Sequence, residues 1–211
     1  MTALLIVSAL ACIVGEYLDL RTLVYVAKPL ATIAVILIAA RSTRPVSARY
    51  RALITAGLLC SLAGDVFLML PGDQFIAGLS SFLLAHLLYI TAFVRHGGGL
   101  RDSRAALVFV IGIVMLVVLW PTLGALRIPV TVYVAVIATM AWQAIARWHH
   151  VGTADARLAA VGAMSFLVSD ASLAFGRFRG DLPGSTVLVL GTYWFAQWCI
   201  ARSVSMSRAA R

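Results

Sequence analysis

The sequence predicts an all-α integral membrane protein, a bundle of about eight transmembrane helices, and three observations support this. Of the 211 residues, 62% are hydrophobic and only 12% are charged, whereas soluble domains are about half apolar and a quarter charged. The mean hydropathy is +0.98. The apolar residues also gather into runs close to the roughly 20 residues that a helix needs to cross a bilayer.

Eight segments of the chain reach or approach that length. They are residues 2–20, 22–40, 52–70, 75–94, 105–120, 129–146, 158–176 and 185–204. The connections are short, so neighbouring helices should be antiparallel and in contact. Since no room remains for a soluble domain, residues 1–211 are interpreted as a single polytopic transmembrane domain. The first segment lacks a basic leader, so we interpret it as a spanning helix and not as a removed signal peptide.

The basic residues predict how the helices are oriented. The chain has 17 Lys and Arg against 8 Asp and Glu, and the arginines punctuate the apolar runs instead of forming a patch. This favours loops beside anionic lipid headgroups over a nucleic-acid partner. One side of the membrane would carry Arg41, Arg44, Arg49, Arg51, Arg95, Arg101, Arg104, Arg147, Arg157, Arg202, Arg208 and Arg211, and the other Arg21, Arg127, Arg177 and Arg179. The first side should be cytoplasmic. We therefore expect a protein of the cell (inner) membrane with both termini in the cytoplasm.

The three cysteines do not form a motif. Cys12, Cys60 and Cys199 are far apart and lie inside apolar segments. This spacing argues against a disulfide framework and against a zinc site. We therefore predict no metal site at these cysteines.

A weak internal repeat relates the two halves of the chain. Residues 57–65, GLLCSLAGD, align with residues 162–170, GAMSFLVSD, and both segments end in aspartate. The copies run in the same direction, which predicts a parallel four-plus-four arrangement of helices.

Asp65 and Asp170 are the most informative residues. Each is expected about 8 Å below the outer end of its helix, at 1.5 Å per residue. An ionised carboxylate inside the membrane costs about 2.5–3.5 kcal/mol even on lenient insertion scales. Either the two carboxylates face one polar cavity, or each is satisfied by a neighbouring helix, for example through an Asp65–Lys28 pair.

Other polar side chains are expected near these aspartates. The candidates for binding or orienting a substrate are Lys28, His86, Tyr193, Gln197, Ser61, Ser169 and Glu16. Gln197 follows Tyr193 by one helical turn, so both should lie on one face. Asp19 and Glu16 should close the first helix at the outer surface.

A pair of buried carboxylic acids has a definite chemical use. A desolvated carboxylic acid resists ionisation, and a second nearby carboxylate adds to this effect. One aspartate can then donate a proton while the other stabilises a cation and activates water. The same pair would also suit a proton-coupled transporter or carrier, and a third interpretation is a scaffold with structural ion pairs.

Several segments resemble the lysoplasmalogenase (YhhN-type) membrane family. They are Lys28-Pro29-Leu30, residues 61–69 (SLAGDVFLM), 75–79 (FIAGL), 82–89 (FLLAHLLY), 169–175 (SDASLAF) and 193–197 (YWFAQ). The likeness extends over nearly the whole chain, in the same order. It implies hydrolysis of the vinyl-ether bond of lysoplasmalogens to a fatty aldehyde and glycerophosphoethanolamine or glycerophosphocholine, without a cofactor. The implied partner is a lysophospholipid within the bilayer.

Overall fold

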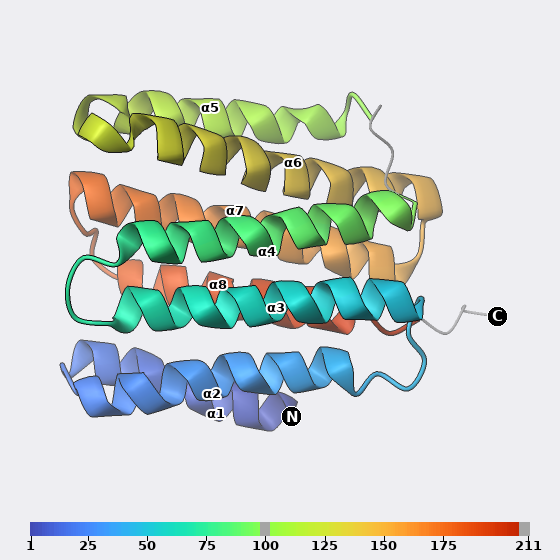
Figure 1. Ribbon diagram of the computed structural model, residues 1–211, viewed down its shortest axis with the longest axis horizontal. Helices are drawn as coiled ribbons and strands as arrows, with labels where there is room; N and C mark the ends of the chain where they lie inside the picture. The colour runs from blue at the N-terminus through green and yellow to red at the C-terminus, as the bar shows by residue number, and fades with distance from the viewer. Residues whose placement is uncertain (98–101, 207–211) are drawn as a thin grey trace.

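The computed structural model describes residues 1–97 and 102–206, and within them the chain forms eight α-helices that lie side by side (Figure 1). They are α1 (Thr2–Tyr17), α2 (Arg21–Ala40), α3 (Ala48–Met69), α4 (Phe75–Arg95), α5 (Val108–Leu119), α6 (Arg127–Val151), α7 (Ala154–Arg179) and α8 (Ser185–Arg202). Short 3₁₀ turns η1 (Ala105–Leu107), η2 (Trp120–Thr122) and η3 (Gly124–Leu126) flank α5. Arg101, Arg208 and Arg211, which contribute to the predicted charge asymmetry, lie outside the described residues.

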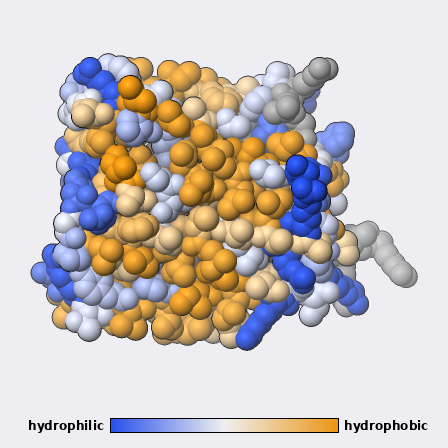
Figure 2. All heavy atoms as spheres, in the orientation of Figure 1, coloured by the Kyte–Doolittle hydropathy of each residue, from blue (hydrophilic) through white to orange (hydrophobic). Residues whose placement is uncertain are grey.

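The prediction of an all-α membrane bundle is confirmed. Six helical segments among the described residues are long and apolar enough to cross a membrane: Arg21–Ala40, Ala48–Met69, Phe75–Arg95, Ala105–Thr122, Gly124–Val151 and Ala154–Arg179. Figure 2 shows the matching surface, a broad apolar belt between two polar ends. The protein is therefore a multi-pass membrane protein.

The two remaining helices are shorter than the predicted spans. α1 has 16 residues, about 24 Å at 1.5 Å per residue, and α8 has 18. α1 ends at Tyr17 and not at residue 20, because the chain turns back at Asp19 with a left-handed φ of 51°. α6 and α7, with 25 and 26 residues, are longer than predicted because they continue through charged residues at their ends.

Glycines allow helices that follow each other in the chain to pack closely. A methyl group on Gly57 in α3 would lie 2.3 Å from the ring of Tyr89 in α4. A methyl group on Gly162 in α7 would lie 2.9 Å from the backbone oxygen of Ala196 in α8. The α3–α4 and α7–α8 pairs are thus in intimate contact, and α8 also packs on α2 and α3. The proposed duplication of the two halves stays a prediction.

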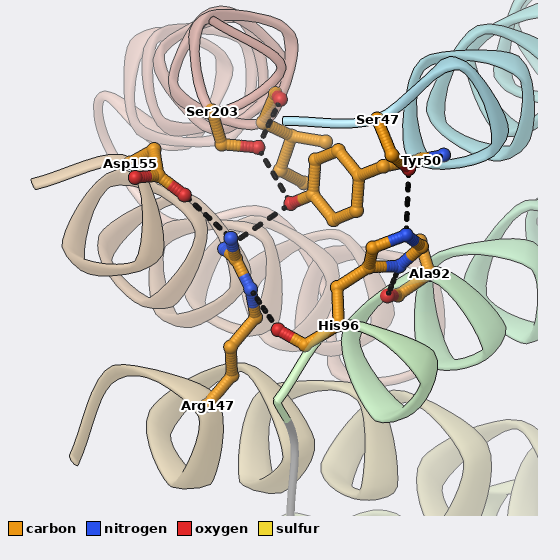
Figure 3. Close-up of polar contacts among 8 residues, drawn as sticks. Ser47, Tyr50, Ala92, His96, Arg147, Asp155 and Ser203 are labelled. Atoms are coloured by element: carbon orange, nitrogen blue, oxygen red, sulfur yellow. Dashed lines mark hydrogen bonds and ion pairs between the residues drawn. The ribbon is translucent and has the colours of Figure 1, made fainter. Parts of the chain in front are cut away.

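A buried polar cluster ties five helices together at the end where α3 begins (Figure 3). Arg147 is 1% exposed, forms a 2.5 Å ion pair with Asp155, and donates a 3.1 Å hydrogen bond to the backbone oxygen of His96. Its guanidinium also lies over the ring of Tyr50, whose hydroxyl is 2.9 Å from that of Ser203. Arg147 was predicted to lie in a loop beside lipid headgroups. That prediction is wrong, because α6 continues past it and packs it inside the protein.

Candidate functional site

A polar cavity opens at the opposite end of the bundle, where α3 ends and α8 begins. Its unoccupied volume, including the opening, is about 1190 Å³. Asp65 from α3 and Asp170 from α7 both line it, together with Lys28 from α2 and Tyr193 from α8. The two aspartates therefore face a common space, although they lie in different halves of the sequence.

Asp65 is held by two hydroxyl groups. It is 2% exposed, and its Oδ2 accepts a 2.7 Å hydrogen bond from Thr32 and another of 2.7 Å from Tyr193. The amide of Gln197 in turn donates a 2.9 Å bond to the Tyr193 oxygen, as expected for residues one turn apart. Tyr89 donates a weaker bond of 3.5 Å to the Gln197 oxygen. This chain of polar groups orients the Asp65 carboxyl toward the cavity.

Asp170 belongs to a second chain of polar groups. The Tyr133 hydroxyl donates a hydrogen bond to Oδ2 of Asp170, and Nε2 of His86 lies 2.9 Å from the Tyr133 oxygen. The same His86 nitrogen is 3.6 Å from Asp170 Oδ2. His86 is completely buried, and its Nδ1 has no hydrogen-bond partner among the described residues. The Asp170 side chain is 14% exposed, so it is more accessible than Asp65.

Aromatic rings separate the two chains of polar groups. Phe82 packs edge-on against Tyr193 and Phe166, with ring centroids 5.9 and 6.1 Å apart. Phe166 also contacts His86 at 4.8 Å. These rings are 7% exposed or less and exclude water from beneath the aspartates. A charge at the cavity therefore interacts with fixed protein groups more strongly than it would in water.

The cavity also has a cationic side. Lys28 and Arg177 line it. Arg177 also forms an ion pair with Asp73 and lies over the ring of Phe75, and Arg179 donates its hydrogen bonds to the backbone oxygen of Val118. No salt bridge joins Lys28 to Asp65 within residues 1–97 and 102–206. The two residues share the cavity, and Lys28 lies one turn before Thr32, which binds Asp65. The structural Asp65–Lys28 ion pair considered from the sequence is therefore not formed.

The other sequence candidates divide into two groups. Glu16 is exposed and Ser169 is 2% exposed, and both line the cavity. The Ser169 hydroxyl donates a 3.0 Å bond to the backbone oxygen of Val189, which leaves its oxygen free to accept. Ser61, His86 and Gln197 do not line the cavity. Ser61 is buried, and its hydroxyl lies 3.4 Å from that of Tyr89.

Two residues of the site were not predicted from the sequence. Thr32 follows Lys28 by four residues on α2, and that spacing would have placed both on one face. Tyr133 lies in the second turn of α6, and a tyrosine inside an apolar span usually has a hydrogen-bond partner. No group of three or more His, Cys, Asp or Glu residues within the described ranges is arranged to hold a metal ion.

Comparison with known proteins identifies the family. The YhhN family model matches residues 23–204, which include every site residue above except Glu16. The chain belongs to the YhhN family. The resemblance inferred from the sequence motifs is thereby confirmed.

Several curated relatives carry the name of an enzyme. The chain is 38% identical over 161 residues to "Lysoplasmalogenase TMEM86A" of Bos taurus and 35% identical over 162 residues to "Lysoplasmalogenase TMEM86B" of Sus scrofa. It is 36% identical over 174 residues to "Lysoplasmalogenase" of Mycobacterium tuberculosis. These matches cover 74%, 75% and 78% of the chain, but only 66%, 66% and 63% of the relatives. The chain thus spans slightly less than two-thirds of their length. No solved structure matches it.

Proposed function

We propose that the protein hydrolyses the vinyl-ether bond of lysoplasmalogens, releasing a fatty aldehyde and glycerophosphoethanolamine or glycerophosphocholine. The observation that carries this proposal is that one polar cavity is lined by Asp65, Asp170 and the two cations Lys28 and Arg177. Acid-catalysed cleavage of a vinyl ether needs a proton donor, a group that stabilises an oxocarbenium ion, and water. The names of the relatives support the same substrate class.

Asp170 is the proton donor in this proposal and Asp65 is the carboxylate. Asp65 accepts hydrogen bonds from Thr32 and Tyr193, and it lies on the side of the cavity nearer to Lys28. Asp65 accepts two such bonds and Asp170 accepts one, from Tyr133, so hydrogen bonds and a nearby positive charge favour the ionised form more strongly at Asp65 than at Asp170. Asp170 is the more accessible of the two and reaches the substrate directly.

The reaction follows in three steps. Asp170 gives its proton to the β-carbon of the vinyl ether, and the ether oxygen shares a lone pair to form an oxocarbenium ion. Asp65 stabilises this cation and takes a proton from a water molecule, whose oxygen bonds to the cationic carbon. The resulting hemiacetal then loses its hydroxyl proton to Asp170, while Asp65 protonates the departing glycerol oxygen. One water is consumed, and both aspartates regain their starting protonation states.

The remaining side chains position these groups. Tyr193 and Gln197 hold Asp65, and Tyr133 and His86 hold Asp170. Ser61 supports this network from behind, and Ser169 and Glu16 face the cavity where water enters. Lys28 and Arg177 bind the phosphate of the substrate. These steps use the chain's own residues, and we propose no resident cofactor.

The proposal includes an orientation in the membrane. The cavity opens at the end that carries fewer arginines, and the positive-inside rule places that end outside. Both termini would then be cytoplasmic, in the cell (inner) membrane. The substrate would be a lysophospholipid that approaches from the outer leaflet.

Aldehyde release from lysoplasmenylethanolamine by purified protein in detergent tests the function. Wild type should release aldehyde, and Asp65→Asn and Asp170→Asn should each slow release at least about 100-fold, as expected when a positioned acid or base is lost. Asp102→Asn is the matched control, because Asp102 lies at the other end of the bundle, beside His149. A folded wild type that releases no aldehyde would contradict the proposal, and proton-coupled uptake of an intact substrate into vesicles would then support a transporter.

A further inference from the structure

A second, apolar cavity lies beside the polar one, between α4, α5, α6 and α7. The figure of about 760 Å³ for its volume counts the space at its opening, and the enclosed part is narrow and much smaller. Of the residues that line it, Tyr133 and Asp170 alone carry polar side-chain atoms. We call this cavity the apolar slot, and its walls include Phe82, Ile111, Gly112, Met115, Val134 and Ala174.

The slot and the polar cavity meet at the proposed proton donor. Leu68, Phe82, Asp170 and Leu173 line both spaces. A molecule that is apolar at one end and polar at the other would therefore fill both, with its junction beside Asp170. The helices of the two spaces differ, since α5 and α6 line the slot but not the polar cavity.

We propose that the slot binds the aliphatic chain of the lysolipid, an assignment that rests on the proposed function. In a lysoplasmalogen the vinyl ether joins the aliphatic chain to the glycerol. With the chain in the slot and the phosphate near Lys28 and Arg177, the vinyl carbon that accepts the proton lies at Asp170. Burial of methylene groups in this apolar space then holds the vinyl-ether bond next to the Asp170 carboxyl group.

The slot also offers a route for the product. Ile111 on α5 lines the slot and is 43% exposed, whereas Leu173 on α7, which is 37% exposed, lines both the slot and the polar cavity. The slot therefore reaches the apolar surface of the bundle at α5. The aldehyde would leave sideways into the bilayer, while the water-soluble glycerophospho product leaves through the polar cavity.

Photocross-linking tests the slot without relying on hydrolysis. The probe is lysophosphatidylethanolamine with a diazirine at the end of its chain, bound to wild-type protein in phosphatidylcholine nanodiscs. We expect labelling of Met115 or Val134, which line the slot, and loss of this labelling when unlabelled lysolipid competes. Labelling confined to the exposed residues Val117 and Val132, or unaffected by competitor, would overturn the proposal.

A matched pair of alanines extends the test to specificity. Ala174→Phe fills the slot, whereas Ala135 is exposed on α6 and lies outside it. Ala174→Phe should reduce the labelling that unlabelled lysolipid competes away by about tenfold or more. It should also lower the ratio of kcat/KM for long-chain substrates to kcat/KM for short-chain substrates by about tenfold or more. Ala135→Phe should change neither. Unchanged chain-length preference in a folded Ala174→Phe variant would overturn the slot, and the wild-type labelling decides if this variant does not fold.

The outcomes separate the two proposals. Slot labelling that competitor abolishes, without aldehyde release, would support the lipid-binding slot and contradict the hydrolase proposal. Aldehyde release that depends on the aspartates, without slot labelling, would support the hydrolase proposal and contradict the slot.

Discussion

The hydroxyl of Tyr193 on α8 donates a 2.7 Å hydrogen bond to Asp65 on α3, across 128 positions of sequence. Tyr193 is 5% exposed, and its ring packs on Phe82 and Phe166. The packing fixes the ring, so that the hydroxyl points at the carboxylate. Tyr193 thus connects the buried aromatic rings of Phe82 and Phe166 to Asp65, one of the two proposed catalytic groups.

Tyr193→Phe should slow aldehyde release while leaving the protein folded. A hydrogen bond to a charged group contributes about 1.5–3 kcal/mol, which corresponds to a roughly 10- to 150-fold lower kcat. The phenylalanine ring keeps the contacts with Phe82 and Phe166. Tyr17→Phe is the control, because Tyr17 is 59% exposed at the end of α1. Equal kcat values for the two variants would show that Tyr193 does not position Asp65.

Arg177→Gln should raise KM for a lysoplasmalogen, because Arg177 lines the cavity where the phosphate is proposed to bind. The side chain is 42% exposed and also pairs with Asp73, so we expect a modest change, about threefold to tenfold, as for an accessible charged contact. Arg179→Gln is matched to it, two residues further along α7 but bound to the Val118 backbone oxygen. A vinyl ether without a phosphate should show the same KM with both variants. A KM difference that persists with that substrate would contradict the phosphate role.

Gly162→Ala should destabilise the protein, whereas Gly191→Ala should not. The new methyl group at Gly162 would meet the Ala196 backbone oxygen and the side chains of Cys199 and Ile200, each at 2.9 Å, and would push α7 and α8 apart. Overpacking of this kind typically costs about 1–3 kcal/mol. Gly191 lies in α8 with no neighbour within 4 Å, so alanine there should be neutral or stabilising by up to about 1 kcal/mol.

Thermal unfolding in detergent, followed by circular dichroism, compares the two variants. A lower midpoint for Gly162→Ala alone is the expected result. Equal midpoints would mean that the two helices separate at little cost.

Much of the fold follows from the composition of the chain and from the length of its apolar segments. Segments of about 20 apolar residues admit few structures in a bilayer, because backbone groups must be paired within the segment. Helix ends are less predictable. α1 stops at Tyr17 because of the turn at Asp19, and α6 continues through Arg147 because Asp155 and Tyr50 satisfy that charge. Both causes depend on contacts that periodicity does not contain.

The candidate site was only partly predictable for a similar reason. Asp65, Asp170 and Lys28 stand out because charge is costly in a membrane. Tyr133 and Thr32 carry no such signal, since tyrosine and threonine are common in helices. Their roles depend on the rotation of α6 and α2 about their axes, which segments that are apolar on all sides do not specify. Packing of the helices therefore decides which hydroxyl meets which carboxylate.

Arg147→Met should destabilise the protein strongly without changing the chemistry at the cavity. The substitution leaves Asp155 buried without its partner and removes the contact with Tyr50 (Figure 3). Breaking a buried ion pair typically costs about 3–5 kcal/mol. The double variant Arg147→Met/Asp155→Leu should regain part of this loss, because neither side chain then carries a charge. Arg202→Met, at an exposed arginine, serves as the control in thermal unfolding.

The activity of the folded Arg147→Met variant should not change. Since the cluster lies at the opposite end of the bundle from Asp65 and Asp170, kcat per folded molecule should match wild type. A reduced kcat in the folded fraction would instead show that the two ends are coupled through α3 and α7.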